Sequence, residues 1–326
     1  FYFFVDVETN PSSTSVRSCA ELLRAKRPEV VFAVGGGSAI DTAKAAIAYL
    51  YADDEDAVFR NRFTVPDDRP IFVCVPTTAG SGSEATHFAV VYRDGVKYSI
   101  KHPHLKPDVA VLDPTLTLSC PRELTLAAGS DAVCQAVESW WSNGADSTSR
   151  ARAVQALSAL VPNLIRVADK PDDIDAREAM MTGAYAAGRA IDITTTTAGH
   201  AMAYGLTTSF GLPHGLAVLA VMRALVAFMS ERSALVEVSR ALTPIFSPYG
   251  GEFAVAFHAL TVEIFRRIEW SGYPFPRGTD EIETAAARLA AGVNVERLAN
   301  HPVSLDDRAI HDLYKTILND QAARAT

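Results

Sequence analysis

Two histidines in apolar surroundings have the clearest capacity for metal chemistry in this sequence. His200 lies in the run Ala198–Tyr204, and His214 directly follows a loop that contains Gly211 and Pro213. With thirteen residues between them, two successive helices can each offer one imidazole to a common point. A lone buried histidine is more often a hydrogen-bonded core residue than a ligand, so the pair alone leaves both interpretations open.

A carboxylate and a carboxamide lie together on a predicted helix, Ser130–Trp141. Asp131 and Gln135 are four residues apart and therefore share one helix face, with apolar neighbours around them. Their oxygens could be two metal ligands. Alternatively, Asp131 is a polar residue at the helix start and Gln135 is its hydrogen-bond partner. Coincidence with His200 and His214 favours a metal site.

Two loops rich in small residues could bind a nucleotide. The run Val34–Asp41 follows a predicted strand and opens a helix, and Pro76–Glu84 follows the next buried strand. Glycines let backbone N–H groups approach a diphosphate, and the helix N-terminus adds a favourable dipole. Each loop alone could be a turn without a ligand. Two of them at the carboxyl edge of one sheet, where nucleotides bind in open α/β folds, support each other.

The elements that must position these residues change in type near residue 120. Before it, short β-rich runs alternate with helical patterns, which predicts an α/β nucleotide-binding domain over 1–120 with a mostly parallel sheet. Beyond it, long helical patterns predict an all-α domain over 121–326. Strands are expected at 1–7, 30–34, 71–75, 89–93, 96–100 and 109–112, and helices at 13–25, 38–50, 130–141, 147–168, 176–191, 214–230, 251–270 and 279–291.

Composition excludes several classes of partner. The chain has 326 residues, with 30 Lys and Arg against 38 Asp and Glu, for a formal charge of −8. This balance argues against nucleic acid or an anionic membrane surface as the main partner. Four widely spaced cysteines fit a reduced, cytoplasmic protein. The apolar run Gly215–Met229 contains Arg223 and is expected to be a buried helix and not a membrane span.

Taken in order, these motifs resemble the iron-containing (group III) alcohol dehydrogenase family, within the dehydroquinate synthase-like superfamily. The similarity depends on Gly35–Ser38 with Asp41 and Lys44, on Pro76–Glu84, on Lys97 before Pro107, Asp113 and Pro114, on Asp131, and on His200 with His214. The resemblance implies NAD(P)H as cofactor, Fe²⁺ or Zn²⁺ as metal, a small aldehyde or alcohol as substrate, and a homodimer.

The resemblance also implies a role for each matching residue. Asp131, His200 and His214 would bind the metal, with Gln135 as a further ligand. Lys97 would reach the nicotinamide ribose and be part of the catalytic site. The cofactor-binding residues would be Gly36, Gly37, Ser38 and Asp41 at the pyrophosphate and Thr77, Thr78 and Ser81 along the nucleotide.

Two departures from the family pattern stand in the metal-binding region. Gln135 occupies a position that is usually His, and Tyr204 occupies a position that is often a second His. Gln135, the run Thr196–Ala201 and Tyr204 resemble the phosphonoacetaldehyde reductase branch. Thr195 stands where that branch commonly has a Lys that could hold an anion, and Lys101, His102 or Arg189 could supply charge instead.

The expected activity is metal-dependent reduction of a small aldehyde to a primary alcohol, with phosphonoacetaldehyde reduction to 2-hydroxyethylphosphonate as the branch-specific form. The metal would polarise the aldehyde oxygen, the nicotinamide would deliver hydride, and Tyr204 or water would protonate the alkoxide. Alternatives are a non-catalytic pseudoenzyme or a sugar-phosphate cyclase of the superfamily. The chain opens at Phe1 within a strand-like run. We therefore expect a preceding stretch, which would distinguish NADH from NADPH.

Overall fold

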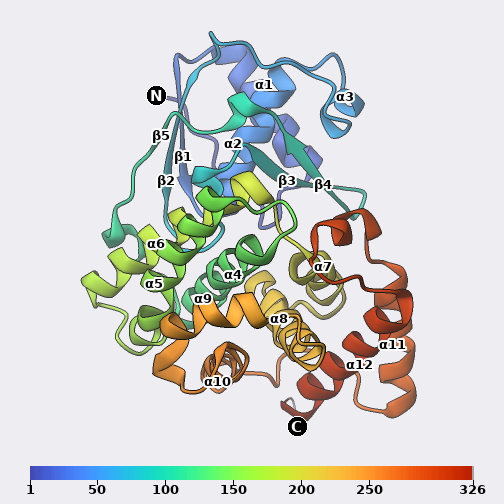
Figure 1. Cartoon of the computed structure of the whole chain (residues 1–326). Helices are drawn as coiled ribbons and strands as arrows, with labels where there is room; N and C mark the ends of the chain where they lie inside the picture. The colour runs from blue at the N-terminus through green and yellow to red at the C-terminus, as the bar shows by residue number, and fades with distance from the viewer. Residues whose placement is uncertain (325–326) are drawn as a thin grey trace.

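The computed structural model describes residues 1–324, without the side chains of 295–297, as an α/β part followed by a helical part (Figure 1). Three parallel strands form the main sheet in the order β1-β2-β5, namely β1 (Val30–Gly35), β2 (Ile71–Pro76) and β5 (Val109–Ala110). The register pairs Val30 with Ile71 and Gly35 with Pro76. The two longer strands therefore end at the same edge.

Helices α1 (Ser13–Lys26) and α2 (Gly37–Leu50) lie beside this sheet (Figure 1). The α1 helix begins where Ser12 accepts a hydrogen bond from the Ser15 backbone N–H, and its apolar stripe is buried. The α2 helix is buried from Thr42 to Tyr49. A short helix, α3 (Glu55–Phe59), follows it.

An antiparallel hairpin forms a second, two-stranded sheet. Its strands are β3 (Phe88–Arg93) and β4 (Val96–Lys101). Asp94 and Gly95 have φ values of 52° and 76°. These positive angles are the geometry that a two-residue hairpin turn requires and that Asp-Gly favours, and the predicted hairpin is confirmed.

The predicted strand at Phe1–Val7 is wrong. Residues 1–8 have no regular secondary structure, and the side chains of Phe1, Tyr2 and Phe3 are exposed. Aromatic and β-branched residues favour strands because such side chains fit a pleated, half-buried surface. In the described part of the chain this run has no partner strand. Nearby, an isolated bridge joins Ser12 to Tyr92.

The helical part surrounds a central helix, α4 (Arg122–Trp141), which starts eight residues before the predicted helix at 130–141 and is buried from Gly129 onward. Three long helices contact it: α5 (Ser147–Asp169), α6 (Ile174–Thr194) and α8 (His214–Glu231). The remaining helices are α7 (Ala198–Phe210), α9 (Val236–Phe246), α10 (Phe253–Phe265), α11 (Thr279–Ala291) and α12 (Asp307–Arg324). Short 3₁₀ turns occur at Ser83–Ala85, Pro103–Leu105, Pro114–Thr117, Ser247–Tyr249 and Val295–Asn300.

Buried apolar side chains form two clusters, one over Val16–Leu105 and one over Leu126–Ala322. These cores lie on either side of residue 120, and the division into domains 1–120 and 121–326 stays a prediction. Among the described helices, α8 alone is long and apolar enough to cross a membrane, and most of it is buried in the second cluster.

Helix α6 joins the two parts. Asp192 Oδ1 accepts hydrogen bonds from the backbone N–H and Nδ1 of His87, at 2.9 and 2.6 Å, and Oδ2 binds Lys106 Nζ at 2.7 Å. One turn earlier, a Cβ added to Gly188 would lie 2.5 Å from the Gly82 carbonyl oxygen. The helix and the loop after β2 are therefore in backbone contact.

Replacing Asp192 with Asn tests this junction. Loss of the partly buried carboxylate should lower the free energy of unfolding by about 1–3 kcal/mol, because charged hydrogen bonds are lost. Urea denaturation would measure the change. Glu231→Gln, at an exposed ion pair with Arg232, is the control and should leave stability unchanged.

The effect should also depend on pH. Burial raises the pKa of Asp192, but hydrogen bonds from His87 and Lys106 outweigh it and lower the pKa to about 2 from the ordinary value of 3.8. A lowered pKa contributes stability above the unfolded value, and this contribution disappears as pH falls through the folded value. The difference between wild type and Asp192→Asn should therefore shrink between about pH 4 and pH 2. A difference that is constant over that range would contradict the assignment.

Candidate active site

The two predicted nucleotide loops lie side by side at the carboxyl edge of the sheet. The Thr77 N–H donates to the Gly35 carbonyl at 3.0 Å. A Cβ added to Gly36 would lie 3.3 Å from Thr78 Oγ1, and one added to Gly37 only 2.6 Å from Ser81 Oγ. Gly37 is also the first residue of α2. Since the first N–H groups of a helix have no intrahelical acceptor, this edge offers free donors to an anion.

Two charged residues of α2 hold the second loop in place. Asp41 accepts from Ser83 Oγ at 2.5 Å and from the Val90 N–H at 2.9 Å. Lys44, which is fully buried, donates from Nζ to the Ser83 carbonyl, Thr86 Oγ1 and the Phe88 carbonyl, at 2.5, 3.0 and 2.9 Å. Both Asp41 oxygens thus bind the protein itself, so the structure shows Asp41 bracing the loop.

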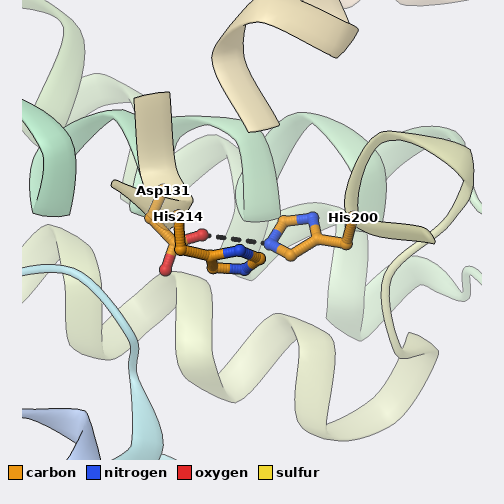
Figure 2. A group of neighbouring side chains, drawn as sticks. All are labelled: Asp131, His200 and His214. Carbon is orange, nitrogen blue, oxygen red and sulfur yellow. Dashed lines mark hydrogen bonds and ion pairs between the residues drawn. The ribbon is translucent and has the colours of Figure 1, made fainter. Parts of the chain in front are cut away.

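Three of the four residues predicted to bind a metal come together from three helices. Asp131 belongs to α4, His200 to α7 and His214 to the start of α8. Their candidate ligand atoms all lie within 4.8 Å of one another. Asp131 Oδ1 is 3.0 Å from His200 Nε2, and the two imidazole rings are 5.5 Å apart. Figure 2 shows the three side chains pointing toward one another.

Glycines allow the helices to approach this closely. A Cβ on Gly215 would lie 1.9 Å from the Ala127 carbonyl oxygen, so the first turn of α8 lies directly on α4. A Cβ on Gly199 would lie 2.9 Å from the Glu138 carboxylate carbon. Gly211 ends α7 in the left-handed region, at φ 69°, and Pro213 precedes α8. These residues place His200 and His214 on either side of one turn.

Glu138 contacts His200 and was not predicted from the sequence as part of the site. Its carboxylate is fully buried; Oε2 contacts His200 Nδ1, and Oε1 accepts from the Thr197 N–H and Oγ1 at 3.0 and 2.7 Å. Glu138 lies seven residues after Asp131, which is two helical turns and therefore the same face. That spacing was the available signal.

The two imidazoles differ in their electrostatic environment. Burial opposes protonation of His200, but the charges of Glu138 and Asp131 outweigh it and raise its pKa to about 9. Burial, and after it the charge of Lys97, lowers the pKa of His214 to about 3. His214 therefore stays neutral, which leaves its lone pair available to a metal.

Gln135 contacts both the cluster and the second loop. Its Nε2 donates to Asp131 Oδ2 and to the Ser81 carbonyl, each at 3.2 Å. Its Oε1 is buried and has no hydrogen-bond partner among the described residues. An unpaired buried carbonyl oxygen on a side chain that contacts Asp131 fits a group that accepts a cation.

Lys97 and Tyr204 lie on the hairpin side of the cluster. Lys97 is on β4, and its charge also acts on Asp131 and Asp41. Tyr204 Oη donates to the Gly95 carbonyl at 2.6 Å, and its ring stacks on Tyr92. The contact that the structure gives for the Tyr204 hydroxyl is thus with the hairpin turn.

Two of the three candidates for extra positive charge, His102 and Arg189, have contacts within the protein. Thr195 ends α6 with φ 57° and accepts from Asn300 Nδ2. His102 accepts from the His104 N–H at the start of a 3₁₀ turn, and the Arg189 guanidinium lies over the Tyr185 ring.

Comparison with known proteins identifies the class. The family model described as iron-containing alcohol dehydrogenase matches residues 1–114, and its C-terminal counterpart matches residues 125–318. The chain therefore belongs to the iron-containing alcohol dehydrogenase family. It is a member of a class of NAD(P)-dependent enzymes that interconvert aldehydes and alcohols.

Several characterised relatives lie near 30% identity. Phosphonoacetaldehyde reductase from Streptomyces viridochromogenes is 35% identical over 80% of this chain and 69% of its own length. Long-chain-alcohol dehydrogenase 1 from Geobacillus thermodenitrificans is 28% identical over 96% and 81%. Aldehyde-alcohol dehydrogenase 2 from Entamoeba histolytica is 31% identical over 70% of this chain, but the match spans only 28% of that protein.

Solved structures agree with this assignment. Sulfoacetaldehyde reductase from Bifidobacterium kashiwanohense, in complex with NAD⁺, has a TM-score of 0.84 and 30% identity, with 97% of this chain and 83% of that chain covered. An iron-containing alcohol dehydrogenase from Thermococcus thioreducens has a TM-score of 0.84 and 25% identity, with 98% and 85% covered. The predicted fold class is therefore confirmed.

Replacing Glu138 with Gln tests the orientation of His200. Loss of the buried charge should weaken Zn²⁺ binding about 10- to 100-fold, because groups that orient metal-binding histidines raise their basicity. Titration of the metal-free protein against a competing chelator measures this. Thr197→Ser keeps the hydroxyl that binds Glu138 and should retain wild-type affinity. Unchanged Zn²⁺ affinity in a folded Glu138→Gln protein would overturn the assignment.

Proposed function

We propose that this chain is a metal-dependent nicotinamide oxidoreductase that reduces a small aldehyde to a primary alcohol. The observation that supports this most directly is the Asp131, His200 and His214 cluster, which lies one side chain away from the second loop through Gln135. A metal site and a dinucleotide edge in such proximity are what hydride transfer to a polarised carbonyl requires.

The donor set fits a divalent transition metal. One carboxylate, two imidazoles and the unpaired Gln135 carbonyl oxygen are ligands that Fe²⁺ and Zn²⁺ both accept. We propose Gln135 as the fourth ligand. An amide oxygen has the same charge as an imidazole but is a weaker donor to these metals, so metal retention should be weaker than with His at this position.

The loops supply the proposed dinucleotide site. Backbone N–H groups of Gly36, Gly37 and Ser38 would hold the pyrophosphate, with Thr77, Thr78 and Ser81 along the nucleotide and Asp41 supporting the loop from behind. Lys97 would contact the nicotinamide ribose. NADH and NADPH are both candidates, and a cytoplasmic homodimer is the proposed form of the enzyme.

Each group has a distinct share of the proposed reaction. When bound, the metal would supply Lewis acidity at the aldehyde oxygen, and the dinucleotide would supply the hydride. The buried carboxylates of Asp131 and Glu138 offset the positive charge of a cation and fix the His200 ring. Tyr204 Oη would carry the proton that the product alcohol needs. Its hydroxyl would first break its hydrogen bond to the Gly95 carbonyl.

Phosphonoacetaldehyde is the proposed specific substrate. Its support is the relative at 35% identity that is named for this substrate, together with the sulfoacetaldehyde reductase structure, whose name denotes another small aldehyde with an anionic group. The position that would hold the anion in that branch is Thr195. Lys101, His102 and Arg189 are the proposed alternatives for that charge.

The decisive experiment combines metal analysis with turnover. Purified protein is analysed for Fe and Zn, and NADH or NADPH absorbance is followed with phosphonoacetaldehyde, sulfoacetaldehyde and unbranched aldehydes. We expect a bound metal and turnover with at least one aldehyde. A folded protein with no metal affinity and no turnover would favour the non-catalytic alternative.

His200→Ala should abolish metal retention and lower kcat/KM by at least about 100-fold, because it removes one ligand and leaves Glu138 buried without its partner. His258→Ala is the matched control, since this histidine is exposed on α10 and contacts Arg223. It should behave as wild type. A His200→Ala protein that keeps its metal and its turnover would remove the cluster from the mechanism.

Tyr204→Phe tests the proposed proton donor. We expect kcat to fall about 100-fold, because general acid catalysis contributes roughly that much. Zn²⁺ affinity should stay unchanged, because the Tyr204 hydroxyl donates to the Gly95 carbonyl. Steady-state kinetics and the chelator titration provide both values. An unchanged kcat would indicate that water, and not Tyr204, protonates the alkoxide.

A further inference from the structure

We propose that Gln135 couples metal binding to dinucleotide binding, as a positioning residue that acts through its Nε2 atom. This inference rests on the proposed function and concerns a second role of the same side chain. The carbonyl oxygen would face the cation, whereas the NH₂ group ties the metal ligand Asp131 to the nucleotide loop.

The orientation of the Gln135 amide follows from its two neighbours. Nε2 lies 3.2 Å from the Ser81 carbonyl oxygen and 3.2 Å from Asp131 Oδ2, and only 4% of the residue is exposed. Both neighbours are acceptors without a hydrogen to donate. A flipped amide would place Oε1 against two oxygens, so the NH₂ group must face them, and each of its hydrogens serves one acceptor.

The loop end of this connection lies against the turn that would hold the pyrophosphate. Ser81 Oγ lies against Gly37, and the Ser83 N–H donates to Ser81 Oγ at 3.3 Å. Lys44 and Asp41 fix the next turn through Ser83. A pyrophosphate that orders the Gly36–Ser38 turn would therefore also order Ser81 and its carbonyl oxygen.

The cluster end is equally defined. Asp131 Oδ1 contacts His200 Nε2, and Oδ2 accepts from Gln135. The two oxygens thus have separate partners, and Gln135 fixes the rotation of the carboxylate about its last bond. Ordering Ser81 lowers the entropic cost of ordering Asp131, which gives positive coupling between the two ligands.

An imidazole at this position could not make the same connection. A histidine that binds a metal through one nitrogen has a single N–H left, and that N–H cannot serve two acceptors with separate hydrogens. Gln135 has two hydrogens and one carbonyl oxygen. It is therefore suited to contact a metal, Asp131 and Ser81 together.

The test measures Zn²⁺ affinity of the full-length, metal-free protein by chelator competition, with and without saturating NAD⁺. We expect NAD⁺ to tighten Zn²⁺ binding about fivefold or more, in the usual range of allosteric coupling. Zn²⁺ must then tighten NAD⁺ binding by the same factor, because linkage is reciprocal. Calorimetry with NAD⁺ checks that equality.

Two substitutions separate coupling from ligation. Gln135→Met keeps the length but has no amide, so the ratio of Zn²⁺ affinities with and without NAD⁺ should fall to about 1. Gln135→Glu keeps oxygen ligands but has no N–H, so Zn²⁺ should still bind while the coupling is lost. Gln321→Met is the matched control, because Gln321 is a buried glutamine on α12 with an unpaired Oε1. It should keep the full coupling.

The outcomes distinguish the two levels of the proposal. If wild type binds Zn²⁺ and NAD⁺ but neither ligand changes the affinity for the other, the inference is overturned and the proposed function stays intact. The same conclusion follows if the coupling survives in Gln135→Met or Gln135→Glu. Wild type that binds neither Zn²⁺ nor NAD⁺ would overturn the proposed function itself. Coupling in wild type and Gln321→Met, with loss in both Gln135 variants, would establish the role.

Discussion

The candidate active site depends on two carboxylates buried on one face of α4. Asp131 and Glu138 hold the His200 ring between them, with Oδ1 of Asp131 at Nε2 and Glu138 at Nδ1. Buried carboxylates are costly unless positive charge or hydrogen bonds compensate them. Thr197 and His200 compensate Glu138, and the charges of His200 and Lys97 act on Asp131. A divalent cation at Asp131 would compensate the buried negative charge. His200 could then lose its proton and act as a neutral ligand. The burial of this face thus favours metal binding.

The same face connects the helical part to the sheet. The second loop follows β2, lies against the Gly36 and Gly37 turn, and is joined through the Ser81 carbonyl to Gln135, one turn from Asp131. Asp41 and Lys44 support this loop from α2, and Asp192 with Gly188 fixes α6 against its far end. A continuous set of contacts therefore leads from the proposed pyrophosphate site to the proposed metal site. The chemistry of hydride transfer needs both in fixed relation.

Local pattern predicted most of the elements and the convergence of Asp131, His200 and His214, and the failures have physical reasons. The two loops and the Asp131, His200 and His214 cluster were predictable because strand ends, helix spacing and short loops determine them. Phe1–Val7 was predicted as a strand because propensity does not reveal whether a partner strand exists. The roles of Glu138 and Lys44 depend on contacts with residues about 40 to 60 positions away along the chain. The close approach of α8 to α4 is possible because Gly215 has no Cβ. The sequence alone does not reveal which helix packs against this glycine.

The central claim is that α4, α7 and α8 together hold one divalent metal. Crystals of the protein grown with Zn²⁺ and measured at the zinc absorption edge test it most directly. We predict one strong anomalous peak about 2.0–2.2 Å from Asp131, His200 Nε2 and His214, with Glu138 still on His200 Nδ1. A crystal without a peak at this position, or with zinc bound only at surface residues, would contradict the account.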